Sequence, residues 1–219
     1  MISKDTIEFL KHLAANNDRD WFQANKTEFE NAKTDLRDLS AYLIGEISKF
    51  DPQIAHVLPQ DCVFRIYRDV RFSKDKSPYK THLGAYISPG GRKSMAPGYY
   101  FHLQPGQSFL AGGKYHPDSS ELLKLRNSIV NNTEDFLNIF ADKAYKKAFG
   151  EMHGEKLVKP PKGFPADHKA IEYLKLKNFI AYREMFDDEL LLSKEFPKLL
   201  VSYFKQMQPL IVFLRKALA

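Results

Sequence analysis

Three arginines, Arg65, Arg68 and Arg71, recur at every third position within one short stretch of this chain. Guanidinium groups bind carboxylates and phosphates through two parallel hydrogen bonds, so on an irregular segment the three side chains could converge on one anion. Asp69 and Asp75 lie in the same stretch and could instead pair with the arginines. The spacing therefore predicts either an anion-binding site or a network of internal ion pairs.

A second group of side chains alternates with apolar residues, as expected for one face of a β-sheet. Its members are Arg65, Tyr67, His82, Tyr86, Tyr100 and His102. A sheet face that only meets water tends towards Thr, Lys, Glu and Ser, whereas these residues supply hydrogen-bond donors, flat rings and a group that titrates near neutral pH. This face is either the floor of a ligand site or a partly covered face whose rings bond to loops.

The distribution of charge favours an anion site in the same region. The sequence has 33 Lys and Arg against 27 Asp and Glu, a formal net charge of +6. The segment 62–93 holds eight of the cations and two of the anions, which accounts for the whole excess. Aromatic residues lie between these cations, and such rings permit base stacking beside phosphate contacts. We therefore expect a phosphate-bearing partner, a nucleotide or a nucleic acid, at a local basic patch.

The residues expected to contact this ligand are Arg65, Arg68, Arg71, Lys80, His82, Tyr100 and His102. An enzyme is the first alternative, in which His82 or His102 acts as general acid or base and the arginines stabilise an anionic substrate. A structural or interaction protein is the second, in which the arginines and aspartates only hold the 68–80 loop. The residues alone leave the three hypotheses open.

Other chemistries have less support in the sequence. The single Cys62 excludes an intrachain disulfide and a multi-cysteine zinc site. His82, His102 and His116 are the plausible histidine set for a metal, and they lack the spacing of a metal motif. The G-x-x-x-x-G-K-[ST] phosphate loop and the G-x-S-x-G nucleophile motif are absent from the sequence. We expect no metal and no cofactor.

Helices are predicted over residues 3–50, before the basic stretch. Ser3 is suited to cap the first of them, because its side chain can accept a hydrogen bond from the first turn. Apolar residues then recur every seven positions, which predicts one long helix from about Asp18 to Lys49. Asp51-Pro52 should end it.

The hydrophobic period changes to two after Cys62, which indicates strands. Three alternating runs predict strands around 62–67, 82–87 and 99–104, and a turn at Pro105-Gly106 predicts a hairpin from the last of these to 108–111. Apolar residues of these runs should face the helices; they are Phe64, Ile66, Leu83, Ala85, Ile87, Phe101 and Leu103.

Residues 117–219 return mainly to helical spacing. Pro117 suits a first helical turn, and Asp167 is predicted to cap a short helix to about Leu176. A weaker strand pattern covers residues 178–185, and a strongly amphipathic helix closes the chain. The sequence thus predicts one α+β domain over residues 1–219, with an antiparallel or mixed sheet at about 62–115 packed on one face by the N- and C-terminal helices.

No apolar run has the length of a signal peptide or a membrane span, so we expect a cytoplasmic protein without a membrane partner. The sequence predicts no oligomeric state.

Five motifs of this chain match one pattern. The basic stretch 64–80 reads FRIYRDVRFSKDKSPYK, and YYFHL at 99–103 and GGKY at 112–115 follow it. NNDRDWF at 16–22 and PKGF at 161–164 complete the set. Together they resemble the domain of unknown function 2461 (DUF2461) family, mostly bacterial proteins of about this length. The resemblance implies a single-domain cytoplasmic protein, and it transfers no catalytic role because the family has no assigned activity.

Overall fold

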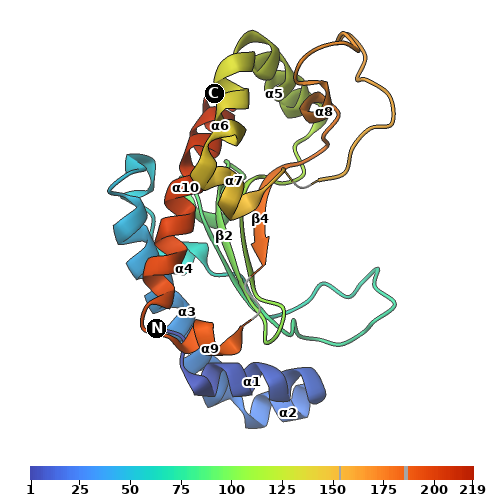
Figure 1. Ribbon diagram of the computed structural model, residues 1–219. Coiled ribbons are helices and arrows are strands. Elements are labelled where there is room, and N and C mark those ends of the chain that lie inside the picture. The colour runs from blue at the N-terminus through green and yellow to red at the C-terminus, as the bar shows by residue number, and fades with distance from the viewer. Residues whose placement is uncertain (153, 185–186) are drawn as a thin grey trace. The chain divides into compact units, whose positions relative to one another are not determined.

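The protein is an α+β fold with one four-stranded antiparallel sheet, seen here in a computed structural model (Figure 1) that describes residues 1–152, 154–184 and 187–219. The strands are β1 (Leu83–Ile87), β2 (Gly98–Leu103), β3 (Phe109–Lys114) and β4 (Phe179–Glu184). They follow one another across the sheet in chain order. The predicted fold class is therefore confirmed, and so is the strand that was predicted at 178–185, although Met185 lies outside the described residues.

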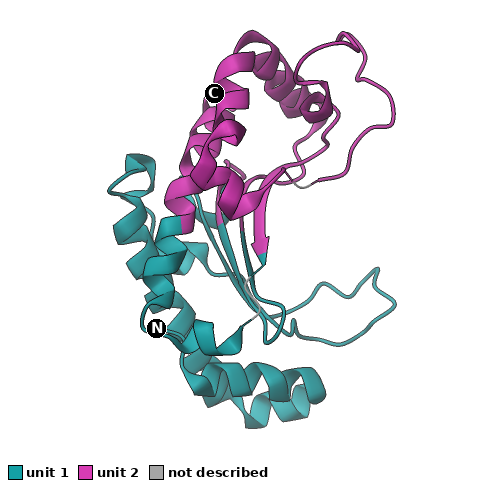
Figure 2. Cartoon of the chain, in the orientation of Figure 1, with its two compact units in different colours: residues 1–94, 100–110, 184–202 teal, residues 95–99, 111–183, 203–219 magenta. Residues whose placement is uncertain are grey.

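The described chain divides into two compact units, which Figure 2 distinguishes by colour. Unit 1 consists of Met1–Ser94, Tyr100–Leu110 and Glu184–Ser202, and unit 2 of Met95–Tyr99, Ala111–Arg183 and Tyr203–Ala219. Every residue of the predicted ligand site belongs to unit 1. The single domain over residues 1–219 stays a prediction.

Unit 1 begins with three helices, α1 (Lys4–Ala15), α2 (Arg19–Ala24) and α3 (Lys26–Ile47). Ser3 caps α1 as predicted, since its hydroxyl accepts a hydrogen bond from the Thr6 amide at 3.2 Å. The prediction of a single helix from Asp18 to Lys49 is wrong, because the helix is interrupted at Asn25. The side-chain amide of Asn25 donates to the Trp21 carbonyl oxygen in the last turn of α2. The hydrophobic repeat continues through the break, which is why the sequence pattern does not reveal it.

The remaining elements of unit 1 are short, except for the start of the last helix. They are η1 (Pro52–Ile54), α4 (Pro59–Cys62), η2 (Gly91–Lys93), α9 (Asp188–Leu192) and the first turns of α10 (Phe196–Leu218). Helix α3 packs against β1, and the apolar side chains of β1 are buried. Phe101 of β2 contacts Phe196 of α10, with ring centroids 5.6 Å apart. The predicted apolar face is thus confirmed for both strands.

The strand predicted at 62–67 is wrong. This segment makes only two isolated antiparallel bridges, Val63 to Ala85 and Tyr67 to Tyr79. Between the bridges, the three residues 64–66 face the five residues 80–84. The two extra residues form a bulge, which interrupts the ladder and turns local side chains to new directions.

Unit 2 contains α5 (Ser119–Asn131), α6 (Thr133–Ala141), α7 (Lys143–Phe149), α8 (Ile171–Leu174) and the rest of α10. Helix α5 starts just after Pro117 and is capped by Asp118 through a capping box with Glu121. The helix predicted from Asp167 is shorter than expected and begins only at Ile171.

Strands β3 and β4 approach each other closely at Gly113. Its φ is +134°, and a Cβ there would lie 1.9 Å from the Phe179 carbonyl oxygen, so only glycine fits. Among the residues described, no helix has the length and apolar character needed to cross a membrane.

Candidate functional site

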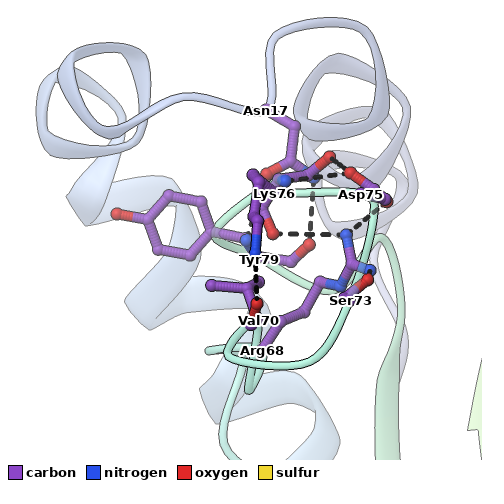
Figure 3. A network of polar contacts seen from close by, with 8 residues as sticks. Asn17, Arg68, Val70, Ser73, Asp75, Lys76 and Tyr79 are labelled. Carbon is purple, nitrogen blue, oxygen red and sulfur yellow. Dashed lines mark hydrogen bonds and ion pairs between the residues drawn. The ribbon is translucent and has the colours of Figure 1, made fainter.

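The basic stretch forms a long loop whose two legs are tied together by Arg68 (Figure 3). The guanidinium of Arg68 donates to the carboxylate of Asp75, to the carbonyl oxygen of Ser77 at 3.2 Å and to the hydroxyl of Ser73 at 3.5 Å. Asp75 also accepts from the Ser77 hydroxyl and, at 2.9 Å, from the Ser77 amide. These hydrogen bonds from Ser77, and then the contact with Arg68, lower the pKa of Asp75 to about 2.

The second arginine of the loop has its own carboxylate. Arg71 donates to both oxygens of Asp69, at 2.9 and 2.7 Å, and this contact lowers the pKa of Asp69. Lys76 donates across the loop to the carbonyl oxygen of Val70 at 3.0 Å (Figure 3). Arg68 and Arg71, both predicted as ligand contacts, are thus engaged by carboxylates of their own loop.

A residue outside the basic stretch fixes the base of this loop. The side-chain amide of Asn17 donates to the carbonyl oxygen of Tyr79 at 3.0 Å, and its oxygen accepts from the Tyr79 amide at 3.1 Å. The Tyr79 ring stacks on Phe22 at 3.9 Å between centroids. Sequence reasoning did not predict Asn17 as part of the site. The motif at 16–22, which contributed to the family resemblance, was the only sign of it.

His82 and His102 lie together on the face of the sheet that carries the polar side chains. Their ring centroids are 4.1 Å apart, and the other side of the His102 ring stacks on Phe109 at 4.4 Å. The bulge between the two bridges contains His82, and this irregularity orients it beside β2. The structure therefore brings together the two histidines that the sequence predicted.

Hydrogen bonds on both ring nitrogens hold His102 in one orientation. Its Nε2 lies 3.0 Å from the side-chain oxygen Oε1 of Gln104, which can only accept, so Nε2 carries the proton. Its Nδ1 then accepts from the Tyr100 hydroxyl at 2.9 Å. Gly84 makes room for that hydroxyl, because a Cβ there would lie 2.7 Å from it. His102 is 8% exposed and has no nitrogen left for a ligand.

His82 has a different environment. Neither of its ring nitrogens has a hydrogen-bond partner within the described ranges, and the side chain is only half-buried. Burial, then His102 and Lys80, lower the pKa of His82 to about 4. Burial also lowers the pKa of His102 and raises the pKa of Tyr100 to about 12. At neutral pH this cluster therefore presents uncharged imidazoles and one imidazole with both nitrogens accessible to a ligand.

Lys80 lies close enough to both histidines to affect their pKa values, and Arg65 lies near Lys80. Lys80 is half-buried, with its ammonium group 5.5 Å from the centre of the Phe64 ring, and Arg65 is exposed. Burial, then the charge of Arg65, lower the pKa of Lys80. In the part of the chain that the structure describes, neither cation forms an ion pair or a hydrogen bond to a carboxylate. The charge of Arg65 lowers the pKa of Asp69, but both carboxylate oxygens of Asp69 accept hydrogen bonds from Arg71.

We call Arg65, Lys80, His82, Tyr100 and His102 the histidine cluster. It contains five of the seven predicted ligand residues, whereas Arg68 and Arg71 belong to the loop network. The described residues contain no group of three or more His, Cys, Asp or Glu that could hold a metal ion.

Unit 2 contains a buried charge that sequence reasoning missed. Lys114, at the end of β3, is 2% exposed and donates to Glu121 at 2.6 Å and to the carbonyl oxygen of Met95 at 2.9 Å. The only sequence signal for this pair was a lysine within a strand pattern, followed a few residues later by the capping box that contains Glu121.

Comparison with protein families gives one match, which covers almost the whole chain. The family model described as "Conserved hypothetical protein (DUF2461)" matches residues 5–213. No curated protein and no solved structure matches.

Proposed function

This chain belongs to the DUF2461 family of conserved hypothetical proteins, and from the chemistry of its own residues we propose that it binds a phosphate-bearing ligand at the histidine cluster. Arg65 and Lys80 would supply the positive charge. His82 would donate a hydrogen bond, while His102 and Tyr100 keep the cluster in place.

One observation carries this proposal: Lys80 and Arg65 lie near each other, and in the described part of the chain neither forms an ion pair with a carboxylate. A partly buried ammonium group loses hydration, and a neighbouring cation adds repulsion, so its charged form is disfavoured unless an anion is nearby. The lowered pKa of Lys80 reflects both the lost hydration and the repulsion from Arg65. A bound anion would remove both costs, which is the arrangement expected of an anion site without its ligand.

The donor set suits a phosphate better than a carboxylate. A guanidinium, an ammonium and an imidazole N–H can address several oxygens at once, and a phosphate group offers more terminal oxygens than a carboxylate. The half-buried rings of Phe64 and His82 also offer apolar surface beside the charges. A nucleotide combines a phosphate with a flat base and therefore matches both features.

The test is calorimetric titration of the protein with pyrophosphate and with adenosine 5′-monophosphate at low salt. Lys80→Met should weaken binding by roughly tenfold or more, because hydrogen bonds to charged groups contribute about 1.5–3 kcal/mol. Lys33→Met is the matched control, since it removes an exposed lysine of α3 that pairs with Glu30 and, like Lys80, lies over a phenylalanine ring. If neither compound binds, or if both variants lose the same affinity, the proposal is wrong.

An enzyme is the second candidate, and the accessible nitrogens of His82 favour it. The neutral imidazole of His82 could accept a proton, while Lys80 and the neighbouring Arg65 stabilise an anionic transition state. Hydrolysis of bis(p-nitrophenyl) phosphate tests this version with a defined probe. Turnover that His82→Asn abolishes and Lys33→Met retains would support it. Turnover in His82→Asn equal to that of the wild type would contradict it.

A further inference from the structure

The loop of the basic stretch carries an aromatic side chain that is almost fully exposed. Phe72 is 97% exposed, and the guanidinium carbon of Arg71 lies 5.9 Å from the centre of its ring. Figure 1 shows the segment between Tyr67 and Tyr79 as a long loop without helix or strand. A fully exposed phenylalanine leaves its apolar area in water, and in this loop the ring also lies among cations, so it is available to a partner that offers both a flat apolar face and negative charge.

The loop network holds Phe72 away from the core. Arg68 ties one leg of the loop to the other through Asp75 and Ser77, and Lys76 donates to Val70 just before the tip. A turn at the tip is closed by the Ser73 amide, which donates to the Val70 carbonyl oxygen at 3.3 Å. Because these contacts fix the loop before any partner arrives, Phe72 can bind with a small loss of conformational entropy.

Cations surround the exposed ring. Arg71, Lys74 and Lys76 are exposed at the tip, and Arg65 and Lys80 lie at the legs of the same loop. Two carboxylates, Asp69 and Asp75, are present, and both are already engaged by arginines. Along the sequence from Arg65 to His82, cations thus alternate with aromatic rings.

We propose that the phosphate-bearing ligand is a single-stranded nucleic acid, with Phe72 stacked on one of its bases. Lys74 and Lys76 would contact phosphates near that base, while Arg65 and Lys80 hold a phosphate at the histidine cluster. This inference rests on the proposed function and adds the class of ligand. Base stacking on aromatic rings together with a cationic track is the usual basis of sequence-independent binding to single strands.

Two other partners fit the loop less well. A duplex hides the faces of its bases, so Phe72 would have nothing to stack on unless the duplex were kinked. A lipid surface would take up the ring, but a single phenylalanine gives weak anchoring. Both partners are therefore outcomes that the experiment must separate.

Fluorescence anisotropy with a labelled 12-nucleotide oligothymidylate tests the inference, beside an abasic oligomer of the same length. Both have the same phosphates, so only contacts with bases distinguish them. Phe72→Ala should weaken binding of the oligothymidylate by roughly 5- to 150-fold, the range measured for stacking on one ring, and leave abasic binding unchanged. Phe72→Trp should retain the affinity. Tyr42→Ala, which removes an exposed ring from α3, is the matched control.

The dependence of affinity on salt measures the phosphate contacts separately. The slope of log affinity against log salt should be about −0.7 for each phosphate neutralised on a single strand. Lys74→Met should make this slope less steep by about one such step. Phe72→Ala should lower the affinity with the slope unchanged.

The inference is overturned if Phe72→Ala binds the oligothymidylate as the wild type does, or if a 12-base-pair duplex binds equally well. It is also overturned if Phe72→Ala affects only binding to vesicles of phosphatidylcholine with 30% phosphatidylserine. In each of these cases, pyrophosphate binding that depends on Lys80 would leave the proposed function intact. If neither pyrophosphate nor the oligomers bind, both proposals are wrong.

Discussion

Lys80 lies just before β1, Lys114 is the last residue of β3, and the two lysines differ in what neutralises their charge. Lys114 is 2% exposed and contacts both Glu121 and a carbonyl oxygen. Lys80 is half-buried, lies over the Phe64 ring and has Arg65 as its charged neighbour. The first lysine is satisfied within unit 2, whereas the second, in unit 1, contacts no carboxylate in the described ranges.

This difference separates a structural charge from a binding charge. A buried ion pair that lacks one partner is strongly destabilising, so a lysine that serves the fold keeps its carboxylate. A lysine that serves a ligand must leave its partner position to that ligand, at some cost to the protein alone. The loop network belongs to the structural kind, because Arg68 and Arg71 each have a carboxylate. Our proposed function assigns the histidine cluster to the binding kind.

The largest expected effect is on the paired lysine. Lys114→Met removes the charge and leaves Glu121 and the Met95 carbonyl oxygen without their partner, so we expect the free energy of unfolding to fall by about 2–3 kcal/mol. Urea unfolding followed by circular dichroism measures it. The double variant Lys114→Met with Glu121→Gln should recover part of the loss. A change below about 0.5 kcal/mol would contradict the assignment of Lys114 as a structural charge.

A second prediction concerns His82 and pH. Its pKa in the folded protein is about 4, against about 6.5 in the unfolded chain, so between these values only the unfolded chain takes up the proton. Stability should therefore fall as the pH drops from about 6.5 towards 4, and His102 acts in the same direction.

Ligand binding should reverse this shift. An anion beside His82 favours the protonated ring, so saturating pyrophosphate should raise the pKa of His82 by about one unit or more, equivalent to about 1.4 kcal/mol. NMR titration of the imidazole protons, with and without pyrophosphate, measures it. His168 in unit 2 is the internal control and should not respond. An unchanged pKa of His82 at saturating pyrophosphate would mean that the anion does not bind beside this histidine.

A smaller effect is expected from Arg68→Ala, which tests the structural hypothesis for the 68–80 loop. Loss of the contacts to Asp75 and Ser77 should loosen the loop, so limited proteolysis within residues 69–77 should accelerate severalfold while the fold persists. Binding of pyrophosphate should be retained, because Arg68 contacts its own loop. Binding of the oligothymidylate should weaken, since Phe72 is then no longer held in place. If proteolysis is unchanged, the network does not hold the loop.

Sequence patterns predicted the sheet and the apolar face because both depend on a period of two that one strand displays by itself. The break at Asn25 was missed, since the hydrophobic repeat passes through it. The strand at 62–67 was predicted wrongly because a bulge depends on how two segments pair, and the pattern of one segment does not record the two extra residues of the other. Local periodicity therefore predicts elements better than it predicts their registers.

The candidate site was predicted as a set of residue types, and the structure distinguishes their surroundings. Spacing suggested that Arg65, Arg68 and Arg71 act together, yet only the positions of Asp69 and Asp75 in the folded loop assign partners to two of them. His82 and His102 were equivalent in the sequence. Their hydrogen bonds make them different, because Tyr100 and Gln104 occupy both nitrogens of His102.

The smallest expected change in stability is the most informative, because it applies the substitution made at Lys114 to Lys80. Lys80→Met loses a cation–π contact with Phe64, which is worth about 0.5–1 kcal/mol, but methionine retains contact with the ring, and the repulsion from Arg65 disappears. We therefore expect a free energy of unfolding within about 0.5 kcal/mol of the wild type, measured in the same urea experiment. A loss as large as that of Lys114→Met would mean that Lys80 serves the fold. A neutral or stabilising change together with lost pyrophosphate binding would mean that its charge is kept for the ligand.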